Sequence, residues 1–179
     1  GEVKAAYLDI GDLNSIENFR RTVFQYRESD QKKADIVVNA AGWDKIQPFL
    51  ESTPEFTDKV LNTNLKGPIN VVRTFLPSMI EANEGKIINI SSDAGRVGSM
   101  GETIYSSAKG GIIAFTKSLA RETARNRINV NCVCPGPTNT PLLAAQPEGM
   151  QEKLTRAIPF RRIAEPEEIA DAVLFFASN

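Results

Sequence analysis

Short β-branched runs alternate with longer helical patterns along this chain, and that alternation limits the fold more than any other feature. The apolar runs lie at 3–10, 35–39, 86–91 and 128–134, with helical patterns between them at about 13–28, 56–81 and 104–125 and a last one starting at Pro166. Parallel strands need a crossover between them, usually a helix, so this order is typical of βαβ units. The sequence therefore predicts an α/β fold with a parallel sheet, in a single domain over residues 1–179.

Two local features refine the helices. Pro68 falls inside the 56–81 pattern, and we expect it to kink that helix because proline has no backbone N–H to donate. The polar, proline-containing segment 142–160 is expected to be a mobile excursion, and 93–101 a flexible Gly-rich loop.

Composition excludes several kinds of chemistry. The chain has no histidine, which removes Ser-His-Asp hydrolysis and His-ligated zinc, so proton transfer must use another side chain. Lys and Arg number 21 against 22 Asp and Glu, a balance that gives no general reason to expect nucleic acid or an anionic membrane as partner. No apolar stretch approaches the roughly 20 residues of a membrane span, and no metal site is predicted.

Cys132 and Cys134 alternate along an apolar run, so on a strand both point to the same face. They are not placed to bridge each other, and we interpret them as small buried hydrophobes in a reducing compartment. A cytoplasmic location follows as an expectation.

Polar residues stand where the predicted strands end. These residues are Asp9, Asn39, Ser91 and Ser92, and the Pro135-Gly136 turn. Ligands of open parallel sheets bind outside the carboxyl ends of the strands, so this convergence predicts a binding site there. Taken alone, Asp9 and Asn39 are more typical of ordinary turns than of a binding site, because Asx side chains bond nearby backbone.

Tyr105 and Lys109 form the sharpest local pattern. Four residues apart on a helix, they lie on one face, one turn from each other. Such pairs occur by chance on many helices, but Ser92 ends a strand thirteen residues before Tyr105, and the loop between can fold it back beside the tyrosine.

Five motifs resemble, in order and spacing, those of the short-chain dehydrogenases/reductases. They are Asn39-Ala40-Ala41-Gly42, Asn64-Leu65-Lys66-Gly67, Asn89-Ile90-Ser91-Ser92, Tyr105-x-x-x-Lys109 and Asn131-x-Val133-x-Pro135-Gly136. Ala40 departs from the family, which usually has a second Asn there. The resemblance implies a Rossmann-like doubly wound parallel sheet and hydride transfer between NAD(P) and a secondary alcohol or ketone.

The resemblance also implies a role for four catalytic residues. Tyr105 would be the general acid–base, Ser92 would hold the substrate oxygen, Lys109 would support the tyrosine and bond the nicotinamide ribose, and Asn64 would hold a water in the proton relay. A free phenol has a pKa of about 10, and we expect the Lys109 ammonium together with a cationic nicotinamide to favour the phenolate.

Cofactor contacts are implied in the same way. Near the adenine the resemblance places Asp9 and Ile10, along the adenosine ribose Asn39, Ala41 and Gly42, and near the nicotinamide Pro135, Gly136, Thr138 and Thr140, with Tyr105 and Lys109. NAD is expected, and NADP is the alternative.

Parts of the family pattern are absent from this sequence. The family opens with a strand, a Gly-rich turn, a helix and a second strand, whereas here Gly11 stands alone and only nine residues precede Ile10. The family also ends with a strand after the final helix. We therefore expect an incomplete Rossmann-like domain that lacks the first βαβ unit and the last strand, with the strand 3–10 left unpaired and with Gly1 and Asn179 as cut edges of a longer chain. Residues 1–179 alone are expected to show no saturable NAD or NADP binding.

Three loops point to a substrate class. Residues 39–44 with Pro48-Phe49, 92–99 and 134–140 resemble the 2-hydroxycyclohexanecarboxyl-CoA dehydrogenases of aromatic acid degradation, with Trp43 and Arg96 the least generic positions. Either these two side chains lie near the substrate mouth, or Trp43 packs under a lid and Arg96 forms a surface pair. The rival substrate class is the 3-oxoacyl thioesters of fatty acid synthesis, including acyl-carrier-protein thioesters.

The expected partners are an acyl-CoA substrate and copies of the chain itself. The resemblance implies a homodimer or homotetramer that packs the helices 56–81 and 104–125 together. A hypothesis from another class is an inactive fragment or degenerate paralogue that acts only as an oligomer partner.

Overall fold

The computed structural model describes residues 2–26, 33–146 and 148–178. Gly1 and Asn179 lie outside the described residues, and so do positions 27 and 28 of the first predicted helix.

Three parallel strands form the sheet, in the order β1-β2-β3. They are β1 (Ile36–Asn39), β2 (Gly85–Ile90) and β3 (Ile128–Val133). Asn39 pairs in register with Asn89, and Ile90 with Val133, so the strands end together at one edge. The predicted α/β fold with a parallel sheet is confirmed.

The strand predicted at 3–10 is wrong. Residues 2–9 are extended but belong to no strand, and residues 2–7 are exposed. A strand needs a hydrogen-bonded neighbour. Among the residues that the structure describes, the edge strand β1, which is the next strand along the chain, pairs only with β2. The β-branched residues of 3–10 therefore have no neighbouring strand to hydrogen-bond with.

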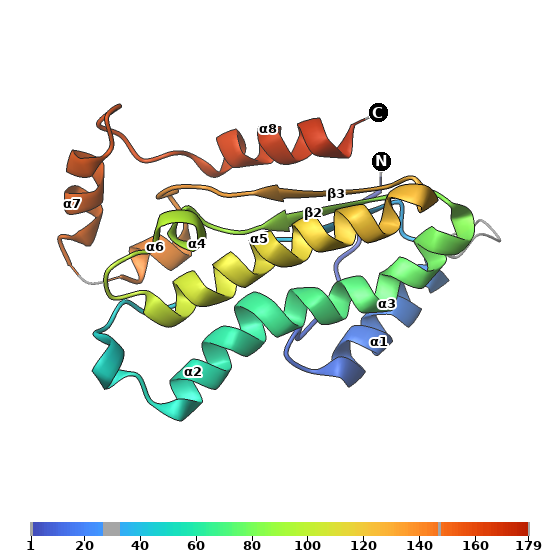
Figure 1. Cartoon of the computed structure of the whole chain (residues 1–179), viewed down its shortest axis with the longest axis horizontal. Coiled ribbons are helices and arrows are strands. Elements are labelled where there is room, and N and C mark those ends of the chain that lie inside the picture. The colour runs from blue at the N-terminus through green and yellow to red at the C-terminus, as the bar shows by residue number, and fades with distance from the viewer. Residues whose placement is uncertain (1, 27–32, 147, 179) are drawn as a thin grey trace.

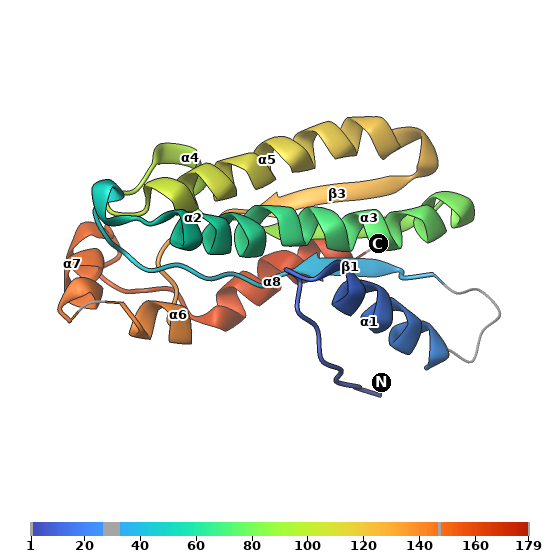
Figure 2. The ribbon, with the colours of Figure 1, turned by 90° about the horizontal axis from the view of Figure 1, so that it is seen from below.

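Helices cover the two faces of the sheet unequally (Figures 1 and 2). On one face lie α1 (Leu13–Gln25), α3 (Gly67–Ala82) and α5 (Thr103–Thr123), and on the other α8 (Pro166–Ala177) packs against β2 and β3. The main core lies under the first three helices, around Ile16, Phe75 and Ile87. On the α8 face, Ile36 and Val38 of β1 keep 45% and 43% of their surface exposed, so that face is covered only in part.

The predicted helix 56–81 is divided into three parts. Helix α2 (Pro54–Leu61) continues into a π-helical turn, Asn62–Lys66, and then into α3. The break thus comes one turn before Pro68 rather than at it. Pro68 has no N–H for the carbonyl four residues earlier, and the widened turn accommodates that missing bond.

Short helices replace two predicted loops. The loop 93–101 contains α4 (Ala94–Val97). The expected excursion 142–160 contains most of α6 (Pro141–Ala144) and all of α7 (Met150–Ala157), and its Pro147 lies outside the described residues. Two short 3₁₀ turns lie at Phe49–Glu51 and Ala124–Asn126. Helix α8 begins at Pro166 as predicted, with a capping box between Glu165 and Glu168. None of the helices in the described part of the chain is long and apolar enough to cross a membrane.

Candidate active site

The segments after β2 and β3 stay paired beyond the ends of the strands. The Ser91 N–H donates to the Val133 carbonyl and the Asp93 N–H to the Pro135 carbonyl, both at 2.8 Å. This pairing holds Ser92 and Pro135 at the same edge of the sheet, as the sequence predicted.

Helix α4 lies directly on helix α5. A Cβ built on Gly95 would lie 2.6 Å from the carbonyl carbon of Lys109 and 2.7 Å from the nitrogen of Gly110, closer than real Cβ atoms come. Only a glycine allows this approach, which seats Ser92 near Tyr105, where its hydroxyl favours the phenolate. The sequence pattern did not single out Gly95, although Gly110 and Gly111 within a helical pattern were a signal of close packing.

Lys109 is buried beneath this contact, with 4% of its surface exposed. Its Nζ donates to the Ile90 carbonyl at 2.9 Å and lies 5.5 Å from the centroid of the Tyr105 ring. The Ser91 hydroxyl donates to the Lys109 carbonyl at 2.8 Å and so fastens this turn of α5 to the end of β2. Burial lowers the pKa of Lys109 to about 8, because it penalises the charged ammonium.

The phenolate is expected only with Lys109 and a cationic nicotinamide acting together, so the chain alone describes the state of Tyr105 before the cofactor binds. In that state burial raises the pKa of Tyr105 to about 12, and the nearby Ser92 hydroxyl offsets this only in part. The ammonium of Lys109 does not reverse the effect in the chain by itself, since it is already engaged by the Ile90 carbonyl. The phenol is therefore strongly held in its protonated form.

Asn64 lies in the π-helical turn and is fully buried. Its Nδ2 donates to the carbonyls of Trp43, at 2.6 Å, and Val60, at 2.9 Å, while its Oδ1 accepts from the Trp43 N–H at 3.2 Å. A Cβ on Gly42 would lie 3.3 Å from the Asn64 Oδ1 and 3.6 Å from the Lys109 Nζ. The structure thus brings the Asn64 Oδ1 and the Lys109 Nζ close to the same side of Gly42, the side on which a Cβ would stand.

Asn39 bonds into the core rather than facing outward or closing a turn. Its Nδ2 donates to the Asn89 Oδ1 at 2.8 Å and to the Pro68 carbonyl at 3.4 Å, and the Asn89 Nδ2 donates to the Thr116 hydroxyl at 3.0 Å. This buried network ties the ends of β1 and β2 to α3 and α5. The Asn39 side chain is therefore engaged within the core, which limits it as a contact to an adenosine ribose.

A hollow of about 380 Å³ opens between this edge of the sheet and α8. Its lining is mostly apolar and includes Val38, Ile90, Pro135, Thr138 and Thr140. Three of these residues were predicted to lie near a nicotinamide, and a flat ring flanked by threonine hydroxyls suits such a lining. Ala41 and Gly136, two further predicted contacts, are exposed at the same edge. The residues present fit the nicotinamide half of a dinucleotide.

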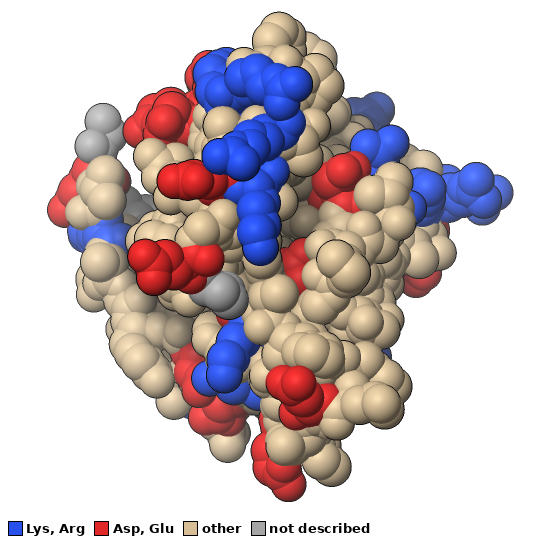
Figure 3. Space-filling model, turned by 90° about the vertical axis from the view of Figure 1, so that its left-hand side faces the viewer, with Lys and Arg blue, Asp and Glu red and all other residues tan. Residues whose placement is uncertain are grey.

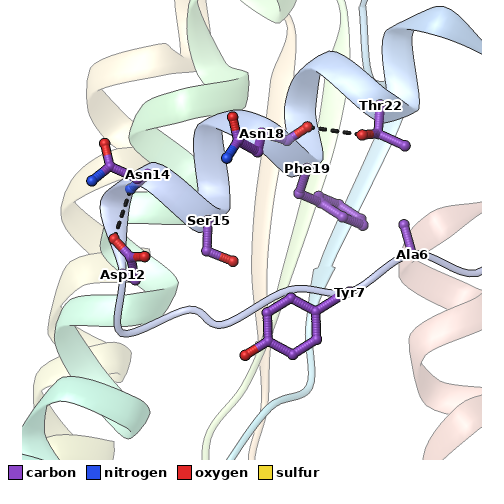
Figure 4. Close-up of a pocket in the computed structure, with 8 residues that line it drawn as sticks. All are labelled: Ala6, Tyr7, Asp12, Asn14, Ser15, Asn18, Phe19 and Thr22. Atoms are coloured by element: carbon purple, nitrogen blue, oxygen red, sulfur yellow. Dashed lines mark hydrogen bonds between the residues drawn. The ribbon is translucent and has the colours of Figure 1, made fainter.

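Asp9 and Ile10, predicted to lie near an adenine, behave as turn and core residues. The Gly11 N–H donates to the Asp9 Oδ1 at 2.8 Å, which is the turn alternative weighed for Asp9. Ile10 packs so closely on Gly67 that a Cβ there would lie 2.8 Å from its Cγ1. A second hollow, of about 420 Å³, runs along α1 next to this turn and is lined by Tyr7, Asp12 and Phe19 among others (Figure 4). None of the predicted catalytic residues lines it.

The other residues that the sequence singled out are the two cysteines, Arg96 and Trp43. Cys132 and Cys134 share a face with their Sγ atoms 3.9 Å apart, are free thiols, and are half-buried; burial raises the pKa of Cys132 to about 11. Arg96 forms the exposed pair with Asp93, at 3.1 Å, which was one of its two alternatives. Trp43 packs edge-on against Phe56 of α2, with ring centroids 5.6 Å apart.

Comparison with known proteins bears directly on this site. A family model described as enoyl-(acyl carrier protein) reductase matches residues 1–179. An acetoacetyl-CoA reductase of Shinella zoogloeoides is 42% identical over 153 residues, which are 85% of this chain and 64% of that protein. A 3-oxoacyl-(acyl-carrier-protein) reductase of Thermotoga maritima is 36% identical over 179 residues, 100% of this chain and 71% of that protein. An acetoacetyl-CoA reductase of a Synechocystis strain is 46% identical over 142 residues, 79% of this chain and 59% of its own. The chain thus spans between 59% and 71% of the length of these relatives.

Proposed function

Because the chain belongs to the short-chain dehydrogenase/reductase family, we propose that it supplies the catalytic part of an NAD(P)-dependent oxidoreductase that interconverts a hydroxyacyl and an oxoacyl thioester. The observation that supports this most strongly is the juxtaposition of Ser92, Tyr105 and Lys109 at the carboxyl edge of the sheet. The names of the relatives, acetoacetyl-CoA reductase and 3-oxoacyl-(acyl-carrier-protein) reductase, support the thioester class.

Tyr105 and Ser92 would act on the substrate oxygen. The dinucleotide, when bound, supplies or accepts the hydride. The Ser92 hydroxyl donates a hydrogen bond to the carbonyl oxygen, which becomes an alkoxide during reduction, and the Tyr105 phenol donates its proton to that oxygen. Since the pKa of Tyr105 is raised to about 12, the phenol is protonated at neutral pH and suited to act as the acid.

Lys109 and Asn64 would help return a proton to Tyr105 after it has donated its own. With its pKa lowered to about 8, Lys109 gains and loses a proton more easily than an ordinary lysine. Because Gly42 has no Cβ, the Lys109 ammonium and the Asn64 amide oxygen both come close to its Cα, and this donor and acceptor would suit a water that passes protons inward. We propose that Tyr105 is reprotonated along this route.

The nicotinamide end of the cofactor would occupy the hollow against α8. Pro135, Gly136, Thr138 and Thr140 would hold it there, together with Tyr105 and Lys109, while Ala41, Gly42 and the turn at Asp9 and Ile10 would lie along the adenosine end with the Asn39 backbone. NAD is the cofactor we propose, with NADP as the alternative to test.

Cations on the site face favour a phosphorylated thioester. Figure 3 looks onto the end of the molecule that carries α7, where Lys and Arg side chains gather in a band. Helix α7 and the residues after it carry four exposed cations, Lys153, Arg156, Arg161 and Arg162. Arg156 pairs with Glu152 and Arg162 with Glu168. Coenzyme A carries phosphates at the end far from its thioester, and cations attract them through charge and hydrogen bonds. We propose a CoA thioester, and 2-hydroxycyclohexanecarboxyl-CoA is the specific substrate proposed from the loops around Trp43 and Arg96.

Steady-state kinetics with the full-length protein test this proposal. Oxidation of NADH and NADPH is followed with acetoacetyl-CoA, a 3-oxoacyl-(acyl-carrier-protein) and 2-oxocyclohexanecarboxyl-CoA, and the N-acetylcysteamine thioester of the preferred acyl group serves as the matched substrate without phosphates. We expect turnover of CoA thioesters, with a KM at least about tenfold lower than for the phosphate-free analogue. A folded protein that turns over none of them, in either direction, would be an oligomer partner or an inactive paralogue instead.

We propose that the enzyme is a homodimer or homotetramer. In this assembly the long helices α3 and α5 of one copy would face those of another. Sedimentation velocity gives the assembly state, and a monomer at micromolar concentration would refute this part of the proposal.

A further inference from the structure

A buried carboxyl group lies behind the site and takes no part in the chemistry above. Asp44 is 6% exposed, and its Oδ2 has no hydrogen-bond donor among the residues that the structure describes. The carboxyl group also contacts the Lys45 backbone N–H. A buried carboxylate oxygen without a donor is strongly disfavoured, so the group is far more stable if a proton occupies that position.

Glu102 provides the second carboxyl group. It directly precedes α5, and its side chain lies within hydrogen-bonding reach of Asp44. The two segments are held together by a hydrogen bond from the Gln47 N–H to the Gly101 carbonyl at 3.0 Å and by the close packing of Gly101 on Ile46. When two carboxyl groups lie within hydrogen-bonding reach, ionising both costs free energy because their negative charges repel. A proton shared between them removes this repulsion. Burial and Glu102 together raise the pKa of Asp44 to about 7.

Tyr105 follows Glu102 by three residues, on the same side of α5. The charges of both Glu102 and Asp44 oppose ionisation of the Tyr105 phenol. The charged and titratable groups that face Tyr105 are thus these two acids and Lys109, whose Nζ lies 5.5 Å from the ring centroid. The acids and the ammonium act in opposite directions on the phenol.

We propose that Asp44 and Glu102 form a positioning pair that shares one proton and keeps Tyr105 in its protonated, proton-donating form, so that reduction continues to higher pH. The inference rests on the proposed role of Tyr105 as the acid. Asp44 and Glu102 act through Tyr105 and touch neither substrate nor cofactor in this account. The pair would favour use of the site as a reductase, because an alcohol can be oxidised only after the phenol has lost its proton.

The variants Asp44→Asn and Glu102→Gln test the pair, with Asp58→Asn as the matched control. At alkaline pH, where the shared proton has been lost and both acids are ionised, each variant removes one negative charge at nearly constant shape. Asp58 is exposed on α2. For the two site variants we expect the midpoint of the alkaline limb, in the pH profile of kcat for reduction, to shift to lower pH by about one unit. KM should change little. The midpoint of the acid limb, in the pH profile of kcat for oxidation, should shift to lower pH by the same amount. The Asp58 variant should have the same pH profiles as the parent protein. Glu102 is only half-buried, so its variant remains informative if the Asp44 variant fails to fold.

A second measurement separates this inference from the proposed function. The chain has three tyrosines, and Tyr7→Phe with Tyr26→Phe leaves Tyr105 as the only phenol. The ultraviolet absorbance of its phenolate can then be titrated without cofactor or substrate, and Asp44→Asn is expected to lower the titration midpoint by about one pH unit. An unchanged midpoint in both folded site variants would overturn the inference. A protein without turnover would overturn the proposed function, and the titration would still decide the role of the carboxyl pair.

Discussion

Replacement of Gly95 by alanine is expected to separate Ser92 from Tyr105. The new Cβ would lie 2.6 Å from the Lys109 carbonyl carbon, whereas ordinary contacts begin at 3.4 Å, so α4 must move from α5 by about 0.8 Å. Both atoms at the contact belong to backbone, which cannot turn aside. Overpacking of this kind costs about 2 kcal/mol of unfolding free energy, which lowers the midpoint of thermal unfolding by about 4 to 8 °C. A displacement near 1 Å at a catalytic group lowers turnover by roughly 100-fold.

Gly110→Ala is the matched control, because it adds the same methyl group to the other side of this contact. Its Cβ would lie 3.2 Å from the Gly95 carbonyl oxygen, which asks for a shift of only a few tenths of an ångström, and alanine favours the helix by up to about 1 kcal/mol. We expect a much smaller loss of turnover and little change in thermal unfolding by circular dichroism. Equal turnover and equal unfolding midpoints for Gly95→Ala and the parent protein would refute the packing argument.

Three further predictions concern stability. Asn89→Ala removes the centre of the buried amide network and should cost about 3 kcal/mol in urea unfolding, whereas Asn129→Ala, on an exposed part of β3, should cost under about 1 kcal/mol. Gly67→Ala places a Cβ 2.9 Å from a backbone carbonyl oxygen and should cost about 1 to 3 kcal/mol, while Gly85→Ala meets only a flexible methionine and should cost less. Folded Asp44 holds its proton up to a pKa of about 7 and the unfolded residue releases it near 4, so stability should fall as pH rises between these values; urea titrations of Asp44→Asn should show a flatter slope there.

Strong periodicity made the regular elements predictable from the sequence. β2, β3, α5 and α8 lie within a residue or two of their predicted positions, because each has a long apolar pattern and clear end signals. The run 3–10 has the same kind of pattern but forms no strand, since a strand depends on a neighbour that the local sequence does not reveal. The short helix α4 and the π-helical turn at Asn64 were missed for a related reason, as both depend on packing against α5 and on the proline that follows.

The sequence predicted which candidate residues come together, but not their electrostatic surroundings. Spacing placed Tyr105 and Lys109 on one helix face and Ser92 within reach of Tyr105, and the structure brings the three together. The direction of the Tyr105 pKa depends on burial and on Asp44, which lies sixty-one residues away in the sequence. A sequence pattern carries no measure of either, and the same holds for the close approach at Gly95.

The central claim is that Tyr105 donates the proton in thioester reduction, and its removal in the full-length protein tests this most directly. Tyr105→Phe takes away one hydroxyl group, and Tyr26→Phe is the matched control at a tyrosine that is 50% exposed. With the CoA thioester that turns over best, we predict a loss of kcat of roughly 100-fold to 10,000-fold for Tyr105→Phe, with unchanged thermal unfolding and parent-like turnover for Tyr26→Phe. Equal turnover for Tyr105→Phe and the parent protein would contradict the account.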